Sequence, residues 1–164
     1  MRSTLALRES DLRLNNIQLQ LHYDRALPFI RGDAQQLKQV FLNILNNAVD
    51  SIMDTGQGGA LDIRVDNDEE DKTISVEFHD SGAGLKEPGR IFDPFYTTKQ
   101  VGKGTGLGLS ICYGIVKEHG GEILAFNHED GGAVLQLRLP VAGVAGTEAE
   151  LFQGSSGGYL RVKE

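Results

Sequence analysis

The sequence has a single cysteine and no long apolar run, and each shortage excludes a class of protein. Cys112 alone cannot form an internal disulfide and fits a reducing compartment, so we expect a cytoplasmic location. No apolar stretch approaches the ~18 residues of a membrane span, and the first residues lack the layout of a signal peptide. Basic residues are outnumbered by acidic ones, 16 to 23, and the net charge of −7 argues against a general nucleic-acid-binding surface. Any site for a polyanion must therefore be local.

The order of predicted elements indicates the fold class of the 164-residue chain. Alternating apolar residues predict strands at 17–21, 29–30 (as a short partner strand), 61–65, 74–78, 122–127, 133–139 and 159–162. Helical periodicity predicts one helix after Asp33 and another from Leu109 to Val116, stopped by Gly120 and Gly121. This order predicts an α+β two-layer sandwich, with helices on one face of a mixed, mostly antiparallel sheet. We assign residues 15–140 to this domain, 1–14 to the end of an upstream helix or linker, and 141–164 to a C-terminal linker or tail.

The first predicted helix carries an unusual polar stripe beside its apolar face. Asp33 is a good N-cap, and Gln36 completes the pattern of a capping box. The apolar face comprises Leu37, Val40, Phe41, Ile44, Leu45, Ala48, Val49 and Ile52. The polar stripe comprises Gln39, Asn43, Asn47 and Asp50. Asparagine is a mediocre helix former, so this stripe is either a solvated surface or a set of amides directed at a hard cation and at phosphate oxygens.

A glycine-rich run, 102–110, comes directly before the second helix. Its four glycines alternate with other residues, and glycine allows backbone N–H groups to approach a ligand closely. A helix N-terminus attracts phosphate groups, although a flexible loop is the alternative explanation. Lys103 precedes Gly104 rather than Ser or Thr, which excludes a P-loop, and the G-x-G-x-G spacing without a preceding strand excludes the dinucleotide fingerprint.

Two further segments are candidates for ligand contact. The predicted strand at 74–78 runs directly into His79 and Asp80, which are followed by Gly82 and Gly84. This pattern is either an ordinary turn or an acceptor for the exocyclic amine of adenine, beside glycines that give the base room. The segment 91–99 has three aromatic residues around a proline, and is either a loop anchored by buried rings or a flap over a ligand, with Lys99 and Lys103 directed at phosphates.

Taken together, these motifs resemble the catalytic, ATP-binding domain of sensor histidine kinases, in the gyrase/Hsp90/histidine kinase/MutL superfamily. The resemblance covers about residues 17–140, and its boxes are the N box at 42–48, the G1 box at 80–84, the F box at 92–95 and the G2 box at 104–109. Gly120 and Gly121 match the last glycine motif of the family. The sequence DPFYTTK is most similar to the nitrogen- and oxygen-sensing branch of the family. One box is a weak signal, whereas four in family order and spacing are a specific one.

The resemblance implies a Bergerat-type pocket in which Mg-ATP lies between the N-box helix and a lid. It implies that Asn47 binds Mg²⁺ and that Asn43 contacts the phosphates or the metal shell, which makes these two residues the catalytic ones. It also implies that Asp80 accepts a hydrogen bond from the adenine N6 amine. The other residues of the implied ATP site are Asp50, Gly82, Gly84, Ile91, Tyr96, Lys99, Lys103, Gly104, Thr105, Gly106, Leu107, Gly108 and Leu109.

Three positions depart from common patterns of the family. Hydrolysing members carry a glutamate four residues before the metal-binding asparagine, where this chain has Asn43, whose amide cannot take a proton near neutral pH. Asp50 stands where many relatives have Lys or Arg, so Lys99 or Lys103 would meet the phosphate charge. The run Gly131–Ala133 stands where relatives often carry a threonine that contacts adenine.

The first of these departures, Asn43 in place of the glutamate, favours a kinase over a hydrolase. We expect phosphoryl transfer to a histidine, with little intrinsic ATP hydrolysis. The chain has four histidines, and none lies in the family's phosphoacceptor context, so the acceptor is expected on a separate dimerisation domain, with a response regulator as downstream partner. We expect the isolated domain to be a monomer that neither binds nucleic acid nor inserts into a membrane. An ATPase of the same fold and a nucleotide-sensing docking module without transfer activity are the alternatives.

Overall fold

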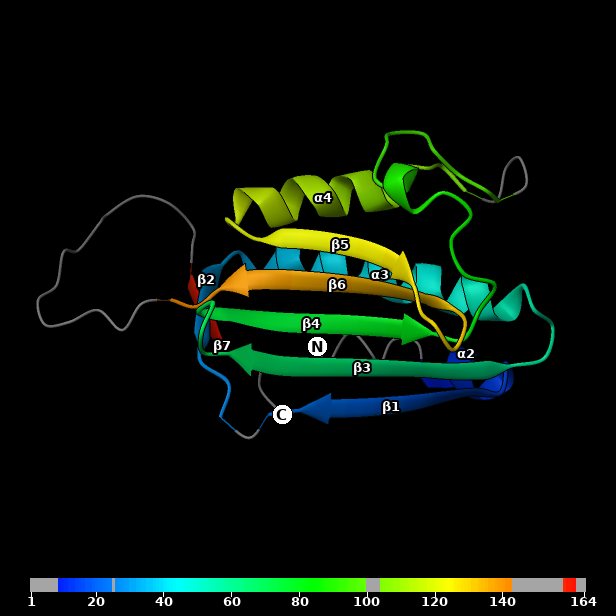
Figure 1. Cartoon of the computed structure of the whole chain (residues 1–164), viewed down its shortest axis with the longest axis horizontal. Helices are drawn as coiled ribbons and strands as arrows, with labels where there is room; N and C mark the ends of the chain where they lie inside the picture. The colour runs from blue at the N-terminus through cyan, green and yellow to red at the C-terminus, as the bar shows by residue number, and fades with distance from the viewer. Residues whose placement is uncertain (1–8, 25, 100–103, 143–157, 162–164) are drawn as a thin grey trace, which may run out of the picture.

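A mixed five-stranded sheet forms the centre of the molecule (Figure 1). The structure, a computed structural model, describes residues 9–24, 26–99, 104–142 and 158–161. The strand order is β1-β3-β4-β6-β5, with β1 and β3 parallel and the other neighbours antiparallel. The strands are β1 (Ile17–Tyr23), β3 (Gly59–Asp68), β4 (Thr73–Asp80), β5 (Glu122–Asn127) and β6 (Ala133–Pro140). The prediction of a mixed, mostly antiparallel sheet is confirmed.

The helices form the second layer, on one face of the sheet (Figure 1). The helical elements are α2 (Glu9–Leu14), α3 (Ala34–Met53), the 3₁₀ turn η1 (Pro88–Arg90) and α4 (Gly108–Glu118). All eight apolar residues predicted for the buried face of α3 are buried, and they pack against inward-facing side chains of the sheet such as Val76 and Phe78. The two-layer α+β fold is therefore confirmed. In the described ranges no helix is long and apolar enough to cross a membrane.

A second, two-stranded sheet corrects one prediction. Residues 29–30 do form a strand, β2 (Phe29–Gly32), but its partner is not β1. Instead β2 pairs antiparallel with β7 (Gly158–Arg161), close to the position predicted for a last short strand. Ile30 is buried and bridges to Val141 just after β6, which holds β2 at the end of the large sheet and away from β1. Residues 1–8, 143–157 and 162–164 of the predicted flanking segments lie outside the described residues, and the domain limits remain predictions.

At the start of α3, the Asp33 side chain caps the helix as predicted, but the Asp33 backbone N–H has a different partner from the one predicted. The Asp33 carboxylate accepts hydrogen bonds from the backbone N–H groups of Gln35 (2.7 Å) and Gln36 (3.1 Å). The predicted capping box is nevertheless wrong, because the Asp33 N–H donates to His119 Nε2 (3.0 Å) and not to the Gln36 side chain. Since Nε2 accepts, Nδ1 carries the ring proton and donates to the Ile115 carbonyl (2.7 Å). His119, at the end of α4, thus joins the two main helices.

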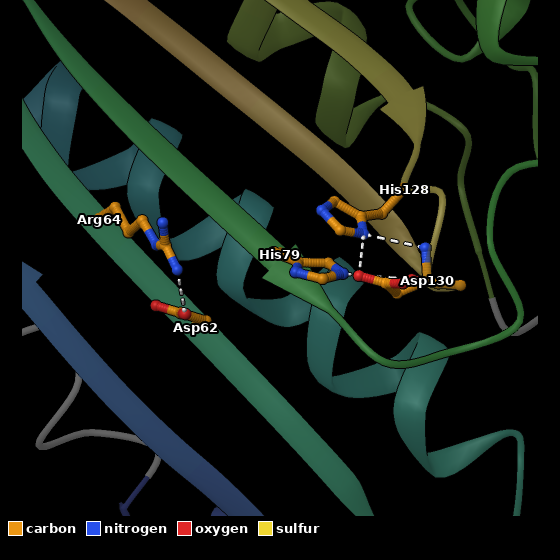
Figure 2. A network of polar contacts seen from close by, with 6 residues as sticks. Asp62, Arg64, His79, His128 and Asp130 are labelled. Carbon is orange, nitrogen blue, oxygen red and sulfur yellow. Dashed lines mark hydrogen bonds and ion pairs between the residues drawn. The ribbon is translucent and has the colours of Figure 1, made fainter.

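The opposite face of the sheet carries polar side chains (Figure 2). Arg64 pairs with Asp62 on β3 (3.3 Å). The rings of His79, on β4, and His128, after β5, are stacked with their centroids 4.1 Å apart. His128 Nδ1 accepts a hydrogen bond from the Asp130 backbone N–H (3.1 Å). This polar surface agrees with a sheet that packs its helices on one face only.

Candidate functional site

A cavity of about 680 Å³ lies among the C-terminal half of α3, the end of β4, the segment Ile91–Lys99 and the start of α4. This volume is in the range of small-molecule and cofactor sites. The predicted site residues that line it are Asn43, Asn47, Asp50, Asp80, Gly84, Ile91, Tyr96, Lys99, Gly104, Thr105, Gly106, Gly108 and Leu109. Gly82 and Leu107 are not part of the lining, and Lys103 lies outside the described residues. The fold therefore gathers residues from four separate motifs around one cavity.

Asp80 is the one buried charged side chain in the described part of the chain, with 2% of its surface exposed. Its burial follows from the alternation along β4, in which Ile74, Val76 and Phe78 face the helices and Asp80 is the next residue in phase. Ile74 and Phe78 contribute to the core, whereas Asp80 reaches the cavity wall. The strand thus carries a carboxylate into an otherwise apolar layer.

Three donors partly compensate the burial of Asp80. Its Oδ1 accepts hydrogen bonds from Ser51 Oγ (3.2 Å) and from the Gly82 N–H (2.9 Å). Loss of hydration raises the pKa of Asp80 above its ordinary value, while the bonds from Gly82, Ser51 and the Ala133 backbone, with the charge of His79, act in the opposite direction. A buried carboxylate in a cavity wall with a perturbed pKa is typical of a functional site.

Two residues that position this end of the cavity were missed by sequence reasoning. Ser51 lies four residues after Asn47, so it continues the polar stripe of α3, and that spacing was the available signal. Asn127, at the end of β5, binds both backbone groups of Leu85: its Oδ1 accepts from the Leu85 N–H (2.6 Å) and its Nδ2 donates to the Leu85 carbonyl (2.9 Å). No local pattern reveals Asn127, because its partner lies 42 residues away.

The glycines of the two loops permit close contacts that a side chain would prevent. A Cβ at Gly132 would overlap the Asp80 carbonyl, and its φ of +78° disfavours other residues. A Cβ at Gly82 would meet Ser51 Oγ. These glycines therefore keep the β5–β6 turn and the G1 loop packed around Asp80. His79 Nε2 also contacts the Gly131 carbonyl (3.1 Å), which adds a side-chain link between β4 and this turn.

The start of α4 faces the cavity with its first residues. No side chain caps the N-terminus of this helix, and both Gly108 and Leu109 line the cavity. Asn43 Nδ2 donates to the Gly108 carbonyl (3.2 Å), which ties the polar stripe of α3 to the glycine-rich run. An uncapped helix N-terminus with glycine-rich backbone is suited to bind an anion such as phosphate.

Lys99 does not point to open space. Its Nζ donates to Asp50 Oδ2 (2.6 Å) and to Asn47 Oδ1 (3.3 Å), so it joins the segment Ile91–Lys99 to α3 across the cavity. Of the predicted polar stripe, Gln39 is exposed and does not line the cavity, so the part of the stripe in the site begins at Asn43. Amide and carboxylate oxygens around a cation are the ligand types that a hard divalent cation prefers.

The segment Ile91–Lys99 packs against the core near its start and lines the cavity further along. Ile91 is buried and Phe92 packs against the core, so one part is anchored. Tyr96 lines the cavity, with the Arg90 guanidinium 4.9 Å from its ring centroid. Phe95 is 74% exposed and has a φ of +67°, a strained conformation for an aromatic residue.

Comparisons with known proteins agree with this fold. Residues 32–143 match the family model of histidine kinase-, DNA gyrase B-, and HSP90-like ATPases. The nucleotide-free catalytic domain of the histidine kinase ThkA superposes with a TM-score of 0.74 at 33% identity, covering 85% of this chain and 90% of that domain. The chain therefore belongs to the family of histidine kinase-, DNA gyrase B- and HSP90-like ATPases. Within that family, it groups with the catalytic domains of histidine kinases.

The curated relatives are much longer than this chain. Sporulation kinase E of Bacillus subtilis (strain 168) is 39% identical over 143 residues, which cover 86% of this chain and 19% of that protein. The sensor histidine kinase ZraS of Escherichia coli (strain K12) is 36% identical over 138 residues, covering 84% of this chain and 29% of that protein. The chain thus spans between about a fifth and a third of the length of these relatives.

Proposed function

We propose that this chain binds Mg-ATP and transfers the γ-phosphate to a histidine on a separate dimerisation domain, as one step of two-component signalling. The observation that carries the proposal is the buried carboxylate of Asp80 in the wall of a cavity that also includes Asn47 and the uncapped start of α4. A carboxylate suits the amino group of adenine, and a helix N-terminus suits phosphates. One nucleotide satisfies both.

The proposed orientation of ATP follows from these groups. The adenine N6 amine would donate to Asp80, and the base would lie in the space kept open by Gly82 and Gly84. The phosphates would receive backbone N–H groups from Gly104–Leu109, with Ile91 and Tyr96 walling the nucleotide. Because Ser51 and Gly82 fix the Asp80 carboxylate, the acceptor is oriented before the nucleotide arrives.

The donor set on α3 also fits Mg²⁺. The Lys99 ammonium contacts both Asn47 Oδ1 and Asp50 Oδ2, so these two oxygens lie close enough together to share one cation, which supports the proposal. We propose that Asn47 holds Mg²⁺, with Asp50 as a second oxygen near it. When bound, Mg²⁺ supplies charge neutralisation for the phosphates.

We propose transfer rather than hydrolysis because of Asn43. Its side-chain amide is bonded to the Gly108 carbonyl, and an amide cannot remove a proton from water. The role left to the site is to position the γ-phosphate for in-line attack by a histidine nitrogen supplied from outside. The phosphoryl group then passes from the γ-position to that nitrogen, and ADP leaves.

We propose a histidine-bearing helical domain and, downstream, a response regulator as protein partners, in the cytoplasm. A solved complex of the histidine kinase ThkA with the response regulator TrrA supports this choice: it matches with a TM-score of 0.70 at 32% identity, covering 86% of this chain and 39% of that chain.

The test is a phosphoryl-transfer assay with γ-labelled ATP, Mg²⁺ and a separately purified histidine-bearing helical domain from a relative such as sporulation kinase E. We expect acid-labile label on that domain and slow release of inorganic phosphate by this chain alone. Brisk hydrolysis by the isolated chain would instead support an ATPase. Nucleotide binding without transfer to any of several such domains would support a docking module.

A further inference from the structure

Lys99 is the one described lysine bonded to the polar stripe of α3. Its ammonium lies 2.6 Å from Asp50 Oδ2 and 3.3 Å from Asn47 Oδ1. The side chains of Lys99 and Asp50 are 27% and 42% exposed, so the pair lies at the mouth of the cavity and not in the core. The contact joins two elements that are 49 residues apart in sequence.

The same contact occupies the oxygens that suit a divalent cation. An ammonium and a metal ion compete for such oxygens, because both are cations that these oxygen atoms attract and contact directly. Resting on the proposed function for the identity of the cation, we propose that Lys99 latches the segment Ile91–Lys99 to α3 in the nucleotide-free domain and must leave Asn47 and Asp50 before a divalent cation binds there. We call this contact the Lys99 latch.

Neighbouring contacts extend the latch to the glycine-rich run. The Lys99 backbone N–H donates to Thr97 Oγ1 (3.2 Å), which orders the turn that carries the ammonium. Gly104 lies against the same two residues, since a Cβ there would come within 2.9 Å of Thr97 Oγ1 and 3.2 Å of Lys99 Cδ. The latch therefore positions the start of the phosphate-binding backbone as well as Lys99 itself.

The Lys99 latch is strong enough to favour contact between the segment Ile91–Lys99 and α3, and weak enough to break when a ligand binds. Charge-assisted hydrogen bonds of this length are stronger than neutral ones, yet partly exposed ion pairs are screened and contribute at most ~1 kcal/mol, about a fivefold ratio. A triphosphate offers Lys99 an alternative anionic partner in the same cavity. Cation and nucleotide are therefore expected to bind with positive coupling, since one removes the competitor of the other.

The first test needs no nucleotide and measures amide hydrogen exchange in the free chain. The reporters are the Tyr96 N–H, bonded to the Asp93 carbonyl, and the Lys99 N–H. In Lys99→Met and Asp50→Asn these amides should exchange about fivefold faster than in the unaltered chain. Lys86→Met is the matched control, because it removes the same charge from the same cavity and leaves the latch intact. Equal exchange in all four proteins would overturn the latch.

The second test measures Mn²⁺ alone, as the probe cation, by electron paramagnetic resonance. Lys99→Met should bind Mn²⁺ about fivefold more tightly than the unaltered chain and the Lys86 control, and adding Asp50→Asn should abolish the gain. Equal Mn²⁺ binding, or none in Lys99→Met, would overturn the competition. Failure of the proposed function has a different signature, because the unaltered chain would then not bind Mg-ATP whatever the exchange and Mn²⁺ data show.

Discussion

Asp80 lies buried in the wall of the candidate site, and its burial affects the stability of the fold. Burial raises its pKa above the ordinary value of 3.8, so the folded chain holds this proton more tightly than the unfolded chain does. The contribution of Asp80 to stability is therefore most favourable below the unfolded pKa and is lost as the pH rises through the folded pKa. At neutral pH the buried carboxylate is destabilising, which is a reason to expect a function that requires its charge.

The raised pKa of Asp80 predicts how Asp80→Asn behaves. The variant keeps an oxygen acceptor for Ser51 and Gly82 but removes the buried charge, so its free energy of unfolding at pH 7 should equal or exceed that of the unaltered chain, by up to ~1 kcal/mol. The difference should shrink as the pH falls through the raised pKa of Asp80. Urea titrations at several pH values measure it. A loss of several kcal/mol at pH 7 would show that the carboxylate stabilises the fold.

Cys112 illustrates a buried group with a packing role. It is fully buried on α4, its thiol contacts the Val40 carbonyl (3.8 Å), and loss of hydration raises its pKa to about 11. We predict that a disulfide reagent at pH 8 modifies the native chain at least ~100-fold more slowly than the chain in urea, because the thiolate is both scarce and inaccessible. Rapid stoichiometric labelling of the native protein would contradict this assignment.

At the scale of elements, His119 connects α4 to the start of α3. In His119→Ala the partly buried Asp33 N–H loses its acceptor. We predict a loss of ~1–3 kcal/mol in the free energy of unfolding. His22→Ala is a suitable comparison, since that half-exposed residue on β1 should change stability by less than ~0.5 kcal/mol. Equal effects of the two substitutions in urea titrations would remove the special role of His119.

The clasp of Asn127 on Leu85 connects the end of β5 to the loop that follows Asp80. Asn127→Ala removes two hydrogen bonds to that loop, and we predict about tenfold weaker Mg-ATP binding. The change in the free energy of unfolding should be smaller than this change in the free energy of binding. Gln136→Ala, which changes an outward-facing residue of β6, is the matched control. Unchanged affinity in Asn127→Ala would mean that the loop keeps its shape without the clasp.

Local patterns predicted the elements better than their connections. The periodicity of α3 identified its whole buried face, and the alternation at 74–78 identified the buried side of β4. The predicted partner of β2 was wrong, because β2 pairs with β7, a segment more than 120 residues further along the chain that no local pattern links to it. The capping box was wrong for a similar reason: His119 reaches Asp33 only after both helices have packed.

At the scale of the whole molecule, the fold converts four sequence motifs into one cavity. Asn47, Asp80 and Gly108 lie on α3, at the end of β4 and at the start of α4, and only the packing of these elements brings them together. Sequence could therefore predict many of the residues that line this cavity but not how they contact each other. The Lys99 contact with Asp50, and the roles of Ser51 and Asn127, became visible only in three dimensions.

The central claim is that this cavity binds Mg-ATP through Asp80, and calorimetric titration of the unaltered chain beside Asp80→Asn tests it most directly. Because the variant is expected to remain folded, any change reports on the binding site. The account predicts micromolar binding by the unaltered chain, about −8 kcal/mol, that collapses in the variant. Equal binding by both proteins, or no binding by the unaltered chain, would contradict it.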